Sequence, residues 1–589
     1  MEPTSEVDLR QLIQSFKRLR VLDLHENNVE KVPRSICKLK YLTYLDLSGN
    51  YKLKRLPKSI TRLQNLQTLN LCGCRALEEL PRDIRKLVSL RNLDIDYCEK
   101  LSYLPRGLGQ LSSLHRLTRF ILPPKKALAK NGCEIGELKE LNNILGSLCI
   151  ENLGSVTDVK AESKAANLIG KHSLESLELQ WGDSDIDDSV IGNGDEMLLD
   201  GLRPHSNLQK LRIKGYKGES FPRWMTDSLV SSLPKLVEVH FVDCGTCKHL
   251  PPVGQLPHLK ILEIGWLNEL EYIESDHSST SAASFPSLLE LKIASCKKLK
   301  ATPPAPHLER LRLCWSHPAL INMIVGLNKL ESLEIWGMES LECVPEECWK
   351  SLTSLESLNI GICPRLTSLS TPIPLGTWHQ SNLVDLHSSD SAELDLSNYV
   401  ESSGGNNLSL ILELHGLRSV TLQQLPKLAS LPLWLLQLSN LEDLTIMYCE
   451  ELDLCKDESG NNNNLILDFH GGLHHSLHSV DLFGLPKLAS LPQWLLQLSN
   501  LERLRIEDCD NLKELPEQIV ALESLQKLQI IKCPSLTSLP EGIRRLASLT
   551  HLRICGCPEL ERRCTRDVGE DWDKIAHIPH ITHEEFSSF

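Results

Sequence analysis

The sequence has 589 residues, is 41% hydrophobic but only 5% aromatic, and carries a net charge of −14 at pH 7. This negative balance argues against a general nucleic-acid binder, because phosphate contacts need a dominant basic face. The sequence contains neither a run of roughly 20 apolar residues, as a membrane helix needs, nor an N-terminal secretory signal. Twenty cysteines without such a signal favour free thiols in a reducing compartment. We therefore expect a cytoplasmic location, which extends to the nucleus or the inner face of the plasma membrane.

A leucine pattern repeats along most of the chain. Counting the first leucine of each copy as position 0, Leu or Ile recurs at positions 3 and 5, Asn or Cys at position 8, and an apolar-Pro step follows. The first copies begin at Leu19, Leu42, Leu66 and Leu90. This is the signature of a leucine-rich repeat. It predicts an α/β-type repeat solenoid, a leucine-rich-repeat horseshoe with a parallel concave β-sheet and a largely irregular convex side.

Interruptions of the pattern divide the chain. At residues 121–172 the register is lost, and we predict an irregular segment with a strand at 148–150 and a short helix at 158–169. An acidic loop follows at 183–196, which indicates a solvated insertion because it lacks the ligand spacing of an EF-hand. The remaining segments are the N-terminal repeats 1–120, irregular repeats 173–375, a low-complexity excursion 376–410, C-terminal repeats 411–560 and a C-terminal tail 561–589.

The clearest copies begin at Leu501, Leu525 and Leu549, each 24 residues after the last. Before them lies an internal duplication, in which residues 425–446 match residues 485–506 at all but three positions. A duplication of this kind lengthens a solenoid, whereas a globular core could not accommodate it.

Position 8 holds nine of the twenty cysteines, from Cys74 to Cys557. Disulfides or metal binding are the functional interpretations of this column. We favour a small buried residue beneath the turn, because Cys244 and Cys247 form a CxxC without a second one at zinc-finger spacing.

Positions 2, 4 and 6 point away from the leucines, since strand side chains alternate between faces. Along the chain these positions change from acidic to basic, and position 6 also carries apolar residues, among them Phe120 and Ile531. Large apolar side chains beside charges are typical of interface hot spots. The candidate partner-binding residues are Asp23, Asp46, Asp94, Lys210, Arg212, Lys214, Arg310, Arg312, Trp336, Met447, Phe483, Arg503, Arg505, Lys527 and Arg553.

Signatures of catalysis are missing from the sequence. It contains no G-x-x-x-x-G-K-[ST], no H-E-x-x-H and no G-x-S-x-G. His577, His580 and His583 are spaced three apart, but Pro579 interrupts a helical arrangement and no acidic ligand is fixed nearby. We therefore predict no enzyme activity, no cofactor and no metal site.

Several motifs together are more specific than a generic repeat. They include residues 136–181, the Phe-Pro-Arg-Trp-Met run at 221–225, Leu-Pro-Pro-Val-Gly-Gln-Leu-Pro at 250–257, and Gly-Glu-Asp-Trp at 569–572. With these motifs the chain resembles the plant intracellular nucleotide-binding leucine-rich-repeat disease resistance proteins of the coiled-coil class. The resemblance covers their repeat region only. The signalling domain and nucleotide switch of an intact member have no counterpart in the sequence.

The resemblance implies a protein-binding module of a plant immune receptor. Its partners would be a pathogen effector or a guarded host protein, together with the nucleotide-binding domain of the same or a related receptor, which it would help to keep inactive. Neither nucleic-acid binding nor membrane insertion is implied. The alternative is a cytosolic leucine-rich-repeat scaffold for signalling complexes unrelated to immunity.

Overall fold

The computed structural model forms two compact units, which are described separately. Unit 1 comprises Met1–Leu288, Ser295–Lys298 and Pro303–Ala305, and unit 2 comprises Leu289–Ala294, Leu299–Thr302 and Pro306–Phe589. The structure describes residues 6–124, 131–182, 193–273, 285–369, 414, 416–432, 435, 438–455 and 476–583. The predicted excursion at 376–410 and most of the acidic loop, 183–192, lie outside the described residues.

Unit 1 contains two series of parallel strands, which pair in chain order. The first series is β1 (Val21–Asp23), β2 (Tyr44–Asp46), β3 (Thr68–Asn70), β4 (Asn92–Asp94) and β5 (Arg116–Leu117). The second is β6 (Arg119–Ile121), β7 (Gly146–Glu151), β8 (Leu174–Gln180), β9 (Lys210–Lys214), β10 (Glu238–Val242) and β11 (Ile261–Gly265).

Unit 2 contains one series of parallel strands, also paired in chain order. Its members are β12 (Glu290–Ala294), β13 (Arg310–Cys314), β14 (Ser332–Trp336), β15 (Ser357–Gly361), β16 (Ser419–Gln423), β17 (Asp443–Met447), β18 (Ser479–Phe483), β19 (Arg503–Glu507), β20 (Lys527–Ile531), β21 (His551–Cys555) and β22 (His580–Thr582).

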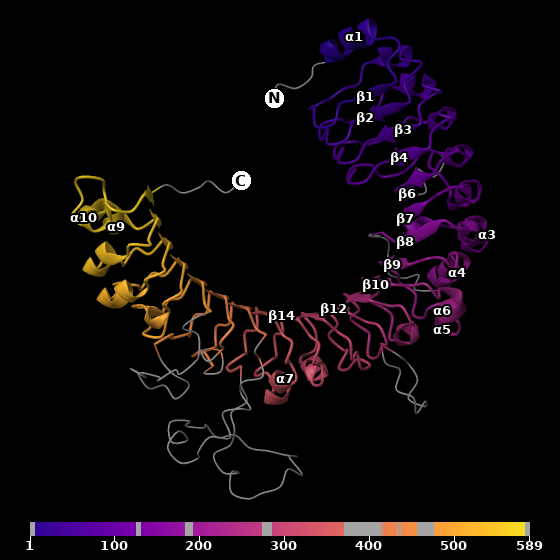
Figure 1. The fold of residues 1–589 in the computed structure, drawn as a ribbon. Helices are drawn as coiled ribbons and strands as arrows, with labels where there is room; N and C mark the ends of the chain where they lie inside the picture. The colour runs from indigo at the N-terminus through magenta and orange to yellow at the C-terminus, as the bar shows by residue number, and fades with distance from the viewer. Residues whose placement is uncertain are drawn as a thin grey trace, which may run out of the picture. The chain divides into compact units, whose positions relative to one another are not determined.

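Short helical turns return the chain to the next strand, on the side opposite the sheet. In unit 1 the strands lie on the inner side of the curve and α3 to α6 on the outer side, and in unit 2 α7 is likewise opposite β12 and β14 (Figure 1). Proline precedes several turns, as Pro57 does before η2 and Pro540 before η15, with φ near −70°. Proline fixes φ and has no N–H for a ladder bond, so the return stays short and irregular.

The returns of unit 1 comprise mostly 3₁₀ turns, with a few α-helices. They are η1 (Arg34–Lys38), η2 (Lys58–Arg62), η3 (Ile84–Lys86), η4 (Leu108–Gln110), η5 (Ile135–Glu140), η6 (Leu153–Ser155), α3 (Val159–Ala165), η7 (Leu168–Gly170), α4 (Asn193–Gly201), α5 (Arg223–Thr226), α6 (Leu229–Ser232) and η8 (Val253–Gln255). The helix α1 (Glu6–Ser15) precedes the first strand. Those of unit 2 are η9 (Pro318–Ile324), α7 (Glu346–Lys350), η13 (Leu495–Gln497), η14 (Glu517–Ala521), η15 (Glu541–Arg545), α9 (Pro558–Arg563) and α10 (Trp572–Ile575). The predicted repeat solenoid, with a parallel sheet and irregular returns, is confirmed within each unit.

The interior is a stack of leucines, and the side chain at position 8 donates hydrogen bonds to backbone carbonyls at its edge. Asn50 Nδ2 donates to the carbonyls of Leu24 and Leu47 at 2.9 and 2.7 Å, and Cys74 Sγ donates to Leu47 O at 3.1 Å. Asn and Cys therefore have the same structural role at position 8. Each donates a hydrogen bond to a backbone carbonyl of the preceding repeat, which would otherwise be buried without a hydrogen-bond partner. The twenty cysteines all lie among the described residues and are free thiols, as predicted.

Residues 121–172 continue the repeats. The expected strand is β7, and the expected helix is α3, with Asp158 as its N-cap accepting from Ala161 N at 3.2 Å. The change of register arises at Thr118, where β5 ends and β6 begins. Arg119 covers this break: its guanidinium donates to Ile95 O at 3.2 Å and pairs with Glu151.

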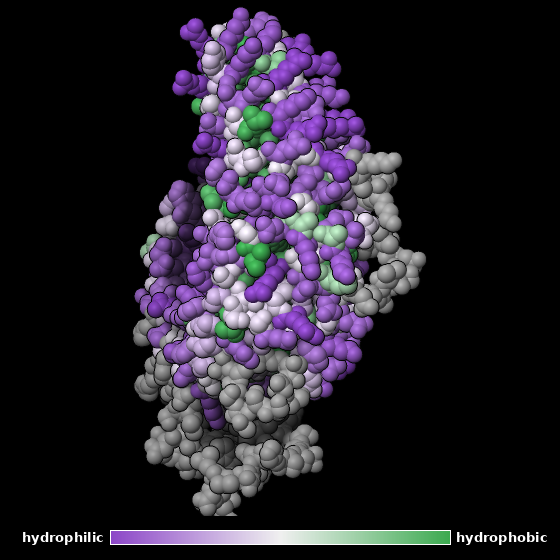
Figure 2. All heavy atoms as spheres, turned by 90° about the vertical axis from the view of Figure 1, so that its right-hand side faces the viewer, coloured by the Kyte–Doolittle hydropathy of each residue, from purple (hydrophilic) through white to green (hydrophobic). Residues whose placement is uncertain are grey.

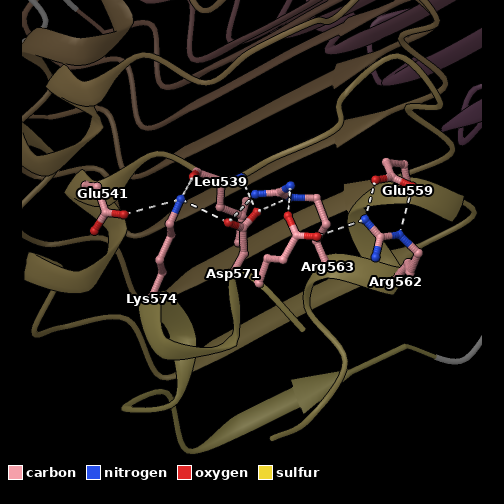
Figure 3. A network of polar contacts seen from close by, with 8 residues as sticks. Leu539, Glu541, Glu559, Arg562, Arg563, Asp571 and Lys574 are labelled. Atoms are coloured by element: carbon pink, nitrogen blue, oxygen red, sulfur yellow. Dashed lines mark hydrogen bonds and ion pairs between the residues drawn. The ribbon is translucent and has the colours of Figure 1, made fainter. Parts of the chain in front are cut away.

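The C-terminal segment, expected as a tail, folds onto the last repeats. Its strand β22 pairs with β21, and α10 packs against η15. Asp571 is fully buried at its centre and accepts from Leu539 N, from Arg563 Nε and from Lys574 Nζ, each at 3.0 Å (Figure 3). We call α9, α10 and β22 the C-terminal cap, because a terminal repeat needs such a cover over its exposed core.

Candidate protein-binding surface

The outward positions of unit 1 hold charges of both signs. Lys210 Nζ lies 2.5 Å from Glu238 Oε2, and Arg212 lies 3.3 Å from Glu178 and 3.8 Å from Glu263. These glutamates stand on the neighbouring strands β8, β10 and β11. The expected basic patch is therefore largely neutralised. The sequence does show the glutamates at outward positions, but only the register places them beside the cations.

His240 continues this network between two carboxylates, with Nδ1 2.5 Å from Glu263 and Nε2 2.7 Å from Glu238. Lys214, at the end of β9, is different. It is exposed and makes no ion pair with any described residue. Of the predicted basic triplet, Lys214 therefore has the charge most available to a partner.

The sheet of unit 2 repeats the same pairing. Arg310 lies 3.2 Å from Glu290, and Arg312 lies 2.5 Å from Glu334. Arg503 pairs with Asp481 at 2.9 Å. Charges paired across strands contribute less to a general attraction than to the choice of a complementary partner.

On strands β18 and β19 of unit 2, Phe483 and Arg505 are in contact. The guanidinium of Arg505 lies 4.7 Å from the centre of the Phe483 ring and also pairs with Glu507 at 2.5 Å. This cation–π contact holds both side chains on the outward face. Lys527 is exposed on the next strand, and Arg553 is half-buried beyond it. Met447 is half-buried on β17.

The three acidic candidates differ in how far their carboxylates are free to contact a partner. Asp23 is exposed on β1, and Asp94 on β4 lies 3.7 Å from Arg116. Asp46 is only 7% exposed and accepts from Tyr44 Oη, Ser48 N and Asn70 Nδ2 at 2.8 to 2.9 Å. Those hydrogen bonds lower the pKa of Asp46, against the effect of its burial. Its oxygens are thus used within the sheet.

Two of the apolar residues expected to be exposed are core residues. Phe120 is fully buried, and Ile531 is 5% exposed. Trp336 is half-buried on β14 and lies against the next repeat, because a Cβ on Gly361 would come 2.5 Å from its ring. The sequence reasoning missed two residues near Trp336: Trp315, whose N donates to Trp336 O at 2.8 Å, and Ile362, which follows Gly361.

Two of the position-8 thiols, Cys74 and Cys98, are held in the protonated form. Burial raises the pKa of Cys74 and Cys98 to about 12, so neither forms the reactive thiolate near neutral pH. Among the described residues, no group of three or more His, Cys, Asp or Glu side chains is placed to hold a metal ion. The described part of the chain also contains no helix of the length and apolarity needed to cross a membrane.

The outer side of unit 1 is mainly hydrophilic. Figure 2 shows the side that carries α3 and α4, where hydrophobic residues appear as small separate spots among polar ones. A surface of this kind is ordinary for a folded protein and does not indicate a docking site.

Known proteins match the repeats directly. The family described as R13L1/DRL21 LRRs matches residues 135–267, and the family described as leucine rich repeat matches residues 17–75. The putative disease resistance protein RGA1 of Solanum bulbocastanum is 40% identical over 388 residues, which are 62% of this chain and 38% of that protein. This chain is a leucine-rich-repeat relative of plant disease resistance proteins.

Other relatives agree. The disease resistance protein RGA2 of Solanum bulbocastanum is 32% identical over 41% of this chain and 26% of its own length. The putative disease resistance RPP13-like protein 1 of Arabidopsis thaliana is 31% identical over 52% of this chain and 30% of its own. The chain thus spans well under half of these resistance proteins. The match to a solved leucine-rich-repeat protein of Leptospira interrogans covers 98% of both chains, at 18% identity and a TM-score of 0.29.

The R13L1/DRL21 match begins at η5 and ends just after β11. Most of residues 121–172, which the leucine pattern predicted as irregular, therefore lies within or borders on this family match.

Proposed function

We propose that the chain is the protein-binding module of a plant immune receptor. The observation that carries the proposal is the sequence similarity between these repeats and those of disease resistance proteins. The module would recognise a pathogen effector or a guarded host protein in the cytoplasm. It would also bind the nucleotide-binding domain of its receptor and help to keep it inactive.

The geometry of the sheets supports binding rather than catalysis. Each strand presents regularly spaced outward side chains on a rigid ladder, and rigid presentation reduces the entropy lost on association. Paired charges such as Arg212 with Glu178 and Arg312 with Glu334 offer both signs to a partner. A surface of this kind selects a complementary partner and rejects others through unpaired charge.

Lys214→Glu tests the proposal without disturbing an ion pair. We would replace the matched repeats of the Solanum bulbocastanum RGA1 relative with this chain and express the chimera in leaf cells. We expect the wild-type chimera to stay inactive without a pathogen. The Lys214→Glu chimera should cause cell death by itself. When this chain and the nucleotide-binding region of the relative are expressed as separate polypeptides, Lys214→Glu should reduce their co-precipitation by about tenfold, for a contact of about 1.4 kcal/mol.

Lys58→Glu is the matched control. Lys58 is exposed at the start of η2, on the side opposite the sheet, and the charge change is the same. If the two variants behave alike, or if the wild-type chimera never supports a defence response, the proposed role of this face is contradicted.

A further inference from the structure

The backbone enters the left-handed region at position 7, directly after the strand. Trp315, Gly337 and Ile362 occupy position 7 in three consecutive repeats of unit 2, with φ of 50°, 67° and 54°. Glycine, Asn and Asp tolerate this conformation, whereas a β-branched residue such as isoleucine is strained by it. An isoleucine is therefore a costly choice at this turn for folding alone.

Gly337 leaves room for the side chain of Trp315, which belongs to the preceding repeat. The indole of Trp315 lies flat over Gly337, so that a Cβ there would come 2.3 Å from the ring. Trp315 is nevertheless 40% exposed, because its other face is open. Trp336, one residue before Gly337, lies in the same way over Gly361, which precedes Ile362. Two indoles and an isoleucine thus gather at one edge of β13 to β15.

A hollow with a volume of about 550 Å³ is lined by Trp315, Glu339, Ser340, Ile362, Pro364 and Arg365. That volume lies within the range of ligand-binding clefts. Its two charges are exposed, and neither Glu339 nor Arg365 makes an ion pair with a described residue. In this they differ from the cations of the nearby sheet, such as Arg310 and Arg312.

We propose that this hollow binds a segment of a protein partner that inserts one large apolar side chain flanked by a basic and an acidic residue. The apolar side chain would lie between Trp315 and Ile362, where desolvation on both sides favours it. The basic residue would meet Glu339 and the acidic residue would meet Arg365, by charge complementarity. The proposal deepens the proposed function, on which it rests, by naming the partner's chemistry and a place of contact.

Strain supports a binding role over a structural one. A residue held in an unfavourable conformation persists at sites where it serves recognition. Ile362→Asn removes the strain, because asparagine adopts the left-handed conformation readily. We therefore expect Ile362→Asn to raise the thermal unfolding midpoint while weakening the binding of partner segments. A residue selected only for folding would instead show a lower unfolding midpoint and unchanged binding of partner segments by the folded protein.

The direct test selects short peptides from a random phage-displayed library on the immobilised full chain. We expect the selected peptides to share an apolar residue between a basic and an acidic one. Trp315→Ala should weaken the best peptide by about tenfold or more, as loss of an aromatic hot spot does. Glu339→Lys should reverse the preference at the basic position of the peptide.

Tyr97→Ala is the matched control, because Tyr97 is a 73% exposed aromatic residue at position 7 of a repeat in unit 1. It should leave peptide affinity unchanged, and circular dichroism should show every variant folded. Gly337→Ala provides a second variant in case Trp315→Ala misfolds, since its Cβ displaces the indole from the hollow. No enriched peptide, or peptides that ignore both Trp315→Ala and Gly337→Ala, would overturn the inference.

The two proposals fail differently. If the hollow variants lose the selected peptides but the RGA1 chimera supports no defence response, the hollow stands and the immune role falls. If the chimera functions and its response is unchanged by Trp315→Ala and Ile362→Asn, the hollow plays no part in recognition and this inference falls alone.

Discussion

Asp571→Asn should detach the C-terminal cap from the last repeats. The carboxylate is fully buried and compensates two cations, Arg563 and Lys574, while also accepting from Leu539 N. Removing one member of a buried, hydrogen-bonded charge group costs about 3 to 5 kcal/mol, because the remaining charges lose their compensation. We expect hydrogen exchange in β21 and β22 to accelerate accordingly, since the cap covers the core there.

The matched control for this change is Glu559→Gln. Glu559 pairs with Arg562 in the same cap (Figure 3), but the two side chains are 44% and 57% exposed. Exposed pairs contribute little, so exchange in β21 and β22 should stay close to that of the wild type. Equal acceleration by both substitutions would show that Asp571 has no special role.

The pH dependence of the cap follows from the same geometry. Hydrogen bonds from Arg563, Leu539 and Lys574 hold the pKa of Asp571 at about 2, below its ordinary 3.8, despite the opposing effect of burial. The folded state therefore prefers the ionised carboxylate, and its contribution to stability is complete above pH 3.8. It should be lost as the pH falls from about 4 to about 2, and Asp571→Asn should lack this loss.

Lys171→Met should remove a pH-dependent rise in the stability of unit 1. Lys171 is fully buried, and its Nζ donates to the carbonyls of Leu138 and Leu141 at 2.7 and 2.8 Å, at the end of η5. Burial lowers the pKa of this amine from 10.5 to about 8. Two carbonyl dipoles solvate the ammonium less well than water does, so the charged form is disfavoured in the folded state.

The sign of the effect follows from proton binding. Below pH 8 both the folded and the unfolded chain carry the charge, and the folded state is penalised. Between about pH 8 and 10.5 the unfolded chain binds more protons, so stability rises with pH, by about 3 kcal/mol in total for this shift. Other groups titrate in the same range, but they are common to the wild type and Lys171→Met.

Hydrogen exchange in residues 135–171 measures the difference between the two proteins at each pH. At equal pH the intrinsic exchange rates of the two proteins are the same. The difference in their measured exchange therefore reports the difference in the free energy of local opening. The wild type should gain protection relative to Lys171→Met as the pH rises from 7 to 10. Parallel behaviour of the two proteins would mean that Lys171 keeps an ordinary pKa.

The outward surface illustrates what sequence reasoning can and cannot reach. Alternation along a strand correctly placed Lys210, Arg212 and Lys214 outward, because it depends only on the period of two. It could not show that Glu178, Glu238 and Glu263 stand beside them, since that depends on register between strands far apart in sequence. It also mistook Phe120 and Ile531 for exposed residues. The change of register at Thr118 aligns Phe120 with the buried Ile150, and Ile531 is paired with Cys555, which is also buried.

The leucine spacing by itself determined the repeat, the parallel strands and the role of the position-8 cysteines. Each of these depends on contacts between equivalent positions of adjacent repeats, which the spacing repeats many times. Only the tertiary structure decided which charges are compensated, that the C-terminal segment is a cap around Asp571, and that Trp315 and Ile362 border one hollow. These features depend on single side chains at non-repeating positions, where no periodic signal indicates which residues will meet.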